Sequence, residues 1–158
     1  MKIFIKSLLF ALMILCMGAI FAFSTQTSEK SNSISKSVAE KITEKAPSAS
    51  EAAPDKDAVK FDKLNLIVRK YAHFTLFFTL GLISSLYAAM AFRKKRVALI
   101  FTLILCLIWA SLDEIHQLYV PGRDGRVTDV LIDMSGSLLA ASLVMAARCA
   151  VCAVKKKK

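Results

Sequence analysis

The chain has four cysteines but lacks the arrangement that a structural zinc site requires. Cys149 and Cys152 form a single C-x-x-C pair near the C-terminus, with no second pair and no histidine close by in the sequence. Cys16 and Cys106 lie inside long apolar runs, where cysteine behaves as a small buried hydrophobic residue. The cysteines therefore favour structural roles over a zinc-binding module.

The N-terminus lacks the features of a cleaved signal. No A-x-A cleavage site follows the first apolar run, and Cys16 lacks the small preceding residue of a lipoprotein signal. The apolar stretch after Lys6 is also longer than a usual signal-peptide core. We therefore predict that the first run is an uncleaved helix.

The net charge of +10 does not indicate nucleic-acid binding, because the basic residues do not form a single cluster but flank the apolar runs. Half of the 22 basic residues flank apolar runs, at Lys2, Lys6, 93–96, Arg148 and 155–158. Basic residues at such positions set the orientation of membrane helices. We interpret them as topology signals and expect no nucleic-acid partner.

Hydrophobic residues make up 56% of the 158 residues and are concentrated in four long runs. The runs predict helices at about 3–23, 71–92, 97–117 and 127–147, each long enough to cross a hydrocarbon core of about 30 Å. The predicted fold is an all-α integral membrane four-helix bundle with both termini in the cytoplasm, because short basic segments mark one end of every run.

The polar segment between the first two runs is the least regular part of the chain. Ile34, Val38 and Ile42 recur at helical spacing, which predicts a short amphipathic helix in this extracytoplasmic loop. A solvated loop is the alternative. Residues 46–57 contain two prolines and are interpreted as a flexible linker inserted in the loop.

Polar residues from all four runs fall in one layer of the membrane. At about 1.5 Å per residue, they lie roughly 23–30 Å from the basic markers and thus near the outer face. Charge at that depth is costly, so these groups should face one another. The candidate ligand-binding residues are Ser24, Gln26, Lys70, His73, Gln117, Arg123, Asp129 and Asp133.

Glu114 and Asp113 are candidate general bases in this layer, with His73 as acid or base partner. His73, Glu114, Asp129 and Asp133 could also ligate a divalent cation, but their spacing matches no known metal motif, so neither a metal nor a cofactor is predicted. The alternative is that the whole layer is a structural network that joins the helices.

Four ordered motifs resemble the VanZ-like family. Phe23–Gln26 resembles its F-S-x-Q element, and residues 70–74 resemble K-x-x-H-F. Residues 113–117 resemble D-E-x-x-Q, and 121–129 resemble P-G-R followed by an aspartate. The resemblance covers most of the chain, although not 46–57. It implies a multi-pass protein of the bacterial cytoplasmic membrane, in a family named for a protein associated with teicoplanin resistance.

Three functions fit these observations. The outward-facing pocket binds a cell-envelope amphiphile, such as a membrane lipid, a lipid-linked precursor or a lipoglycopeptide, with Lys70 and Arg123 holding an anionic head group. Alternatively, the chain is an intramembrane enzyme acting on an envelope lipid, or a structural or partner-binding protein without catalysis. Transport is less favoured, because no polar residue continues the layer toward the cytoplasmic face.

Overall fold

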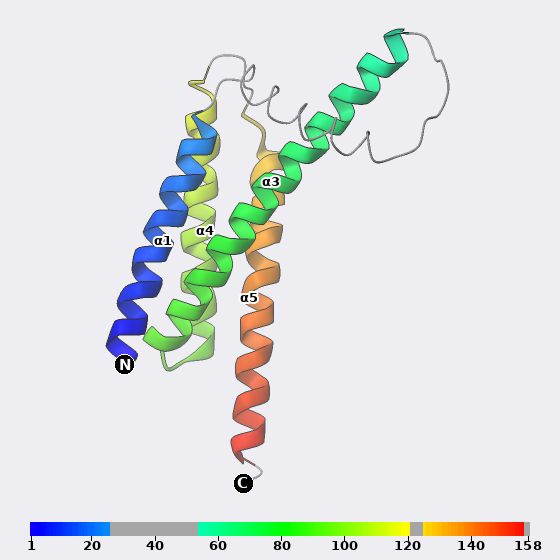
Figure 1. Cartoon of the computed structure of the whole chain (residues 1–158). Helices are drawn as coiled ribbons and strands as arrows, with labels where there is room; N and C mark the ends of the chain where they lie inside the picture. Colours follow the sequence, from blue (N-terminus) through cyan, green and yellow to red (C-terminus); the bar gives the residue numbers. More distant parts are fainter. Residues whose placement is uncertain (26–53, 121–124, 157–158) are drawn as a thin grey trace.

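The computed structural model describes residues 1–25, 54–120 and 125–156, which are helical apart from short connections (Figure 1). The helices are α1 (Lys2–Ser24), α3 (Pro54–Ala91), α4 (Lys95–Gln117) and α5 (Val127–Lys156). Each contains a stretch long and apolar enough to cross a membrane, which in α3 is Ile67–Ala91. The all-α fold and the four candidate spans are therefore as predicted.

Two helices are longer than their apolar runs. The α3 helix begins at Pro54, so residues 54–57 of the expected linker are helical. Proline suits the first helical position, because its missing N–H would have no intrahelical partner there. The α5 helix continues past 147 to Lys156, since neither glycine nor proline follows Gly136. The expected amphipathic helix, with Ile34, Val38 and Ile42, lies outside the described residues.

The α3 and α5 helices approach so closely that two glycines contact backbone of the opposite helix. A Cβ atom on Gly81 would lie 2.7 Å from the Cα atom of Ser137, and one on Gly136 would lie 2.5 Å from the carbonyl oxygen of Phe74. The Ser137 hydroxyl donates a hydrogen bond across the same contact to the carbonyl of Phe77, at 3.1 Å. Small residues allow this close helix packing, as is typical of membrane bundles.

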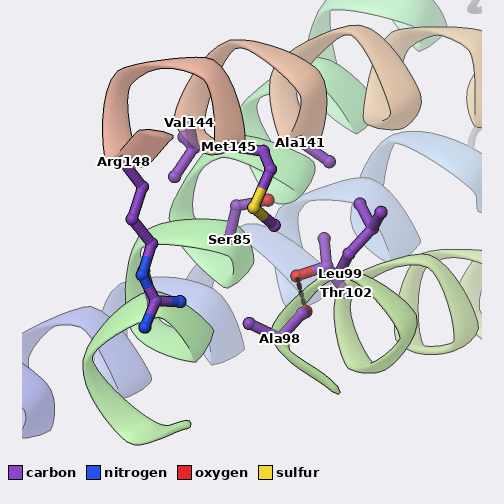
Figure 2. A pocket seen from close by; sticks show the side chains of 9 residues that line it. Ser85, Ala98, Leu99, Thr102, Ala141, Val144, Met145 and Arg148 are labelled. Carbon is purple, nitrogen blue, oxygen red and sulfur yellow. Dashed lines mark hydrogen bonds between the residues drawn. The ribbon is translucent and has the colours of Figure 1, made fainter. Parts of the chain in front are cut away.

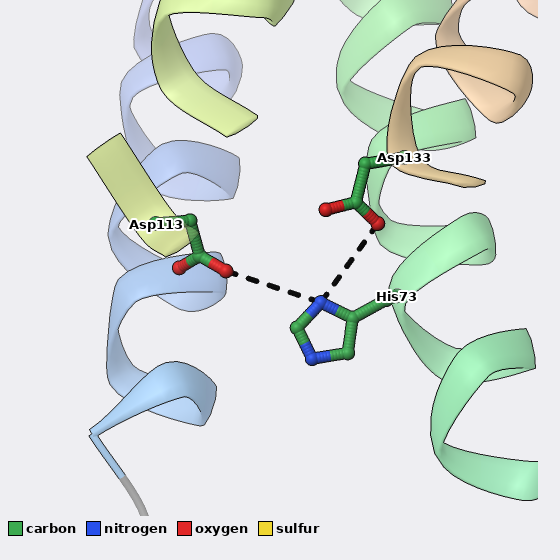
Figure 3. Close-up of side chains that lie close together, drawn as sticks. All are labelled: His73, Asp113 and Asp133. Atoms are coloured by element: carbon green, nitrogen blue, oxygen red, sulfur yellow. Dashed lines mark ion pairs between the residues drawn. The ribbon is translucent and has the colours of Figure 1, made fainter. Parts of the chain in front are cut away.

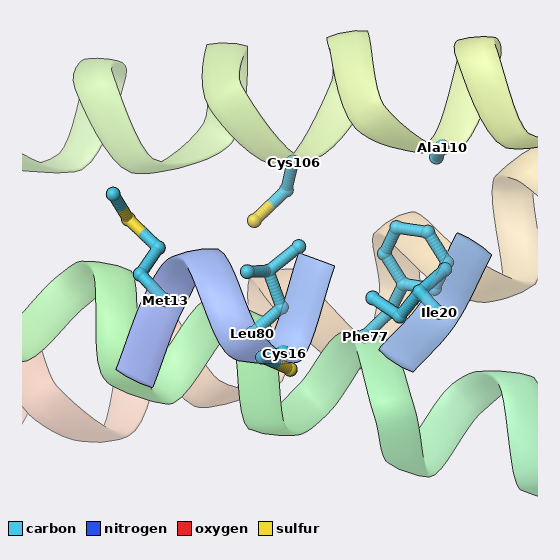
Figure 4. Close-up of a cluster of buried hydrophobic side chains, with 7 residues drawn as sticks. All are labelled: Met13, Cys16, Ile20, Phe77, Leu80, Cys106 and Ala110. Atoms are coloured by element: carbon cyan, nitrogen blue, oxygen red, sulfur yellow. The ribbon is translucent and has the colours of Figure 1, made fainter. Parts of the chain in front are cut away.

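The interior of the bundle is a small apolar cluster contributed by α1, α3 and α4 (Figure 4). Cys16 and Cys106 belong to this cluster, which confirms that both are buried apolar residues. Many large apolar side chains instead point outward, including Leu15, Ile104 and Leu138. A water-soluble protein rarely exposes so much apolar surface, whereas lipid-facing helices do.

The start of α1 and the end of α5 lie at the same end of the bundle, together with the tight α3–α4 connection (Figure 1). We call this the basic end, after Lys2, residues 93–96 and Arg148. Arg148 of α5 donates hydrogen bonds to the carbonyls of Phe92 and Arg93, at 2.8 and 3.2 Å, and thereby caps the C-terminus of α3. Beside it, Ser85 and Arg148 border a cavity of about 10 Å³ between α3, α4 and α5, which accommodates at most one water molecule (Figure 2).

Candidate functional site

The opposite end of the bundle collects the polar residues. We call it the polar end; it is formed by the last turn of α1, the start of the α3 span, the last turns of α4 and the first turns of α5. Five polar side chains there are 7% exposed or less: Ser24, Asp113, Glu114, Gln117 and Asp133. Polar groups so well buried in a bundle of this size must bind one another, a ligand or an ion.

His73 lies at the centre of the polar end, between two aspartates from different helices (Figure 3). Its Nδ1 atom on α3 is 3.9 Å from Oδ2 of Asp113 on α4 and 3.9 Å from Oδ1 of Asp133 on α5. The three ligand-type atoms all lie within 4.8 Å of one another. An imidazole and two carboxylates placed in this way can transfer protons or coordinate a cation.

Gln117 links Asp113 to a cationic residue that the sequence reasoning missed. The Gln117 amide donates a 3.0 Å hydrogen bond to Oδ2 of Asp113, and its amide oxygen accepts one from Arg69 at 3.2 Å. Arg69 stands four residues before His73, so both occupy the same face of α3. That four-residue spacing is the signal for Arg69 in the sequence, although the sequence prediction names Lys70.

Glu114 holds the connection between α4 and α5. One of its carboxylate oxygens accepts a hydrogen bond from the backbone N–H of Arg126, the residue before α5. Its other oxygen, Oε2, is buried without a hydrogen-bond partner among the described residues. Asp113 lies 3.9 Å from His73, whereas Glu114 is bonded to the backbone of Arg126, so Asp113 is the better candidate for a general base partnered by His73.

Lys70 and Asp129 form a more exposed part of the polar end. The Lys70 ammonium lies 3.9 Å from Oδ1 of Asp129, and the two side chains are 45% and 28% exposed. Lys70 also borders an open groove of about 370 Å³, which is lined in addition by Tyr71, Phe74 and Ile132. A half-exposed cation thus stands at the edge of an apolar groove between α3 and α5.

Three further residues are expected in the site: Ser24, Gln26 and Arg123. Ser24 is fully buried at the end of α1, and its hydroxyl has no hydrogen-bond partner within the described part of the chain. Gln26 and Arg123 lie outside the described residues, so their expected roles stay predictions.

The amino-acid sequence of this chain matches a known protein family. The family model described as VanZ/LLP1 matches residues 9–148, most of the chain. The chain belongs to the VanZ/LLP1 family. No curated protein and no solved structure shows significant similarity to it.

The VanZ/LLP1 match confirms the resemblance that the four motifs indicated. The matched segment runs from within α1 to within α5, so it contains the motifs carrying Ser24, His73, Asp113 and Asp129. The polar end is therefore part of the VanZ/LLP1 domain itself and not an addition at its termini.

Proposed function

We propose that the polar end of this VanZ/LLP1 protein binds an anionic amphiphile of the bacterial cell envelope. The observation that carries the proposal is the groove between α3 and α5, which has a cation at its edge. Its apolar wall, from Phe74 and Ile132, suits an acyl or polyprenyl chain, and the Lys70 ammonium suits a phosphate or carboxylate. The buried carboxylates and His73 lie at the same end of the bundle.

The proposed orientation places the basic end in the cytoplasm and the polar end toward the outside of a bacterial cytoplasmic membrane. The support is the concentration of basic residues at one end of the bundle, because loops rich in Lys and Arg remain cytoplasmic. In this orientation the groove opens into the outer leaflet, where lipid-linked precursors of the envelope and lipoglycopeptides such as teicoplanin are both accessible. Both have an apolar chain and an anionic group, so either one fits the groove.

Substituting Lys70 with alanine is expected to weaken amphiphile binding about tenfold or more, because a charge-assisted hydrogen bond is lost. The measurement is saturation binding of two labelled probes, a polyprenyl phosphate and teicoplanin, to the full chain in lipid nanodiscs. Ile132→Phe should also weaken binding by filling the groove. Which probe binds distinguishes the lipid precursor from the lipoglycopeptide as the source of the ligand.

Lys94→Ala is the matched control, since Lys94 is an exposed lysine at the basic end. It should leave the affinity unchanged. The proposal is wrong if neither probe binds saturably, or if Lys70→Ala binds both probes as tightly as the unmodified chain.

A second candidate function is catalysis on the same envelope lipid. The observation that favours it is the position of His73 between two buried aspartates, an arrangement suited to proton transfer. In this function Asp113 acts as the base and His73 as its acid or base partner, while Glu114 retains its structural bond to the backbone of Arg126.

If the chain is an enzyme, Asp113→Asn should reduce turnover of a labelled polyprenyl phosphate by about a hundredfold or more. The measurement is product formation in nanodiscs, with helix content and probe binding checked in the same preparation. Equal turnover by the variant and the unmodified chain would eliminate this function without affecting the binding proposal.

A further inference from the structure

Three potential metal ligands converge at the polar end from three different helices (Figure 3). They are Nδ1 of His73 on α3, Oδ2 of Asp113 on α4 and Oδ1 of Asp133 on α5. The sequence could not show this set, because its members are 20 or more residues apart and follow no metal-binding motif. The set that the sequence suggested contained Glu114 and Asp129, which instead contact the backbone of Arg126 and the side chain of Lys70.

The distances within this set are too long for direct hydrogen bonds. Both contacts from Nδ1 of His73 are 3.9 Å, whereas N–H···O hydrogen bonds measure about 2.7–3.2 Å. A single ring nitrogen also has at most one hydrogen to donate. The space shared by the three atoms therefore suits a small ion better than it suits hydrogen bonds among the three side chains.

Unpartnered carboxylate oxygens are a second, independent observation. Oδ1 of Asp133, the oxygen that faces His73, is buried and has no hydrogen-bond partner among the described residues. Oδ1 of Asp113 is also buried without such a partner, whereas Oδ2 is the Asp113 oxygen that faces His73. The two residues are only 1% and 3% exposed, and Figure 3 shows their carboxyl groups turned toward His73. Burying a carboxylate oxygen without a partner is destabilising, and a bound cation would offset that cost at Asp133.

The surroundings hold at least one of these ligands in place. Gln117 donates its 3.0 Å hydrogen bond to the same Asp113 oxygen that faces His73, and Arg69 in turn fixes Gln117. Metal-ligating carboxylates in proteins are commonly oriented by such hydrogen bonds. The orientation of Asp113 is therefore set before any ion binds.

We propose that His73, Asp113 and Asp133 form a binding site for a divalent transition-metal ion, Mn²⁺ or Zn²⁺. Imidazole together with carboxylates favours these ions over Ca²⁺ and Mg²⁺, which prefer ligand sets made only of oxygen. Bonds of about 2.0–2.2 Å would draw the three atoms closer together, which modest side-chain rotations achieve. Three protein ligands leave at least one position on the ion for water or an anionic oxygen.

The test is metal binding to the full chain, purified in detergent, freed of any affinity tag and stripped with EDTA. We expect one Mn²⁺ per chain, measured as loss of the free-ion electron paramagnetic resonance signal, with Zn²⁺ competing for the same site. Asp133→Asn should lower the affinity at least about tenfold, since even residues that only orient a ligand contribute that much. Pulsed spectra of bound Mn²⁺ should show coupling to a nitrogen, which His73→Gln abolishes.

Asp129→Asn is the matched control, because it removes the same charge from the same helix without removing one of the three ligands. It should change the affinity much less than Asp133→Asn does. Helix content and elution volume show whether Asp133→Asn is folded. If it is not, the loss of nitrogen coupling in His73→Gln tests the site instead. The proposal is overturned by no saturable binding, by equal weakening in the two aspartate variants, or by bound Mn²⁺ without nitrogen coupling. None of these measurements depends on amphiphile binding, so the metal-site proposal can fail or succeed independently of the proposed function.

Discussion

Gly136→Ala is expected to lower the thermal stability of the bundle, even though alanine is the better helix former. The new methyl group would lie 2.5 Å from the carbonyl oxygen of Phe74 and 3.2 Å from the backbone nitrogen of Phe78. Both neighbours are backbone atoms, so no side-chain rotation relieves the contact and α5 must move away from α3. Overpacking of this kind costs about 1–3 kcal/mol, which corresponds to a decrease in Tm of roughly 2–12 °C.

Gly18→Ala is the control for this prediction. It adds the same methyl group to a glycine in α1, but a Cβ atom there meets nothing within 4 Å. Its Tm in the same detergent should be unchanged or higher, because alanine improves helix propensity by up to about 1 kcal/mol. Equal Tm values for the two variants would show that α3 and α5 are not in close contact.

Glu114→Ala is expected to loosen the start of α5 and to destabilise the fold by about 1.5–3 kcal/mol. The reason is that the backbone N–H of Arg126 loses a charged acceptor, and hydrogen bonds to charged groups contribute about that much. Hydrogen exchange measures the effect at the site itself. The Arg126 amide should exchange slowly in the unmodified chain and markedly faster in the variant.

Glu114→Gln separates the role of the hydrogen bond from that of the negative charge. The glutamine retains an oxygen that can accept from Arg126 but removes the negative charge, so the exchange rate at Arg126 should lie between those of the unmodified chain and the alanine variant. If the glutamine variant unfolds as readily as the alanine variant, the charge itself holds the helices together. That result would favour a structural network at the polar end over a binding pocket.

Much of the architecture follows from the sequence, because each prediction depends on one helix at a time. Hydropathy and helical rise place a residue along its own helix, and this was enough to assign Asp113 and Asp133 to one layer. Contacts between residues of the same helix can also be predicted from their spacing in the sequence. Asp113 and Gln117 stand four residues apart, and the structure joins them by a hydrogen bond. The structure begins α3 at Pro54, earlier than the predicted start at about residue 71, because its first turns are polar and hydropathy does not detect a polar helix.

What only the tertiary structure decided is which residues of different helices face one another. The close contact of Gly81 and Gly136 with the opposite backbone fixes how α3 and α5 are rotated. That rotation brings His73 to Asp133, while Lys70 is directed to Asp129 and the groove. The depth of a residue in the membrane, estimated from the helical rise, cannot distinguish these pairings. Residues at one depth can point in any direction around the helix axis. The sequence thus determined the layer in which the polar residues lie, and helix packing determined the His73, Asp113 and Asp133 cluster within it.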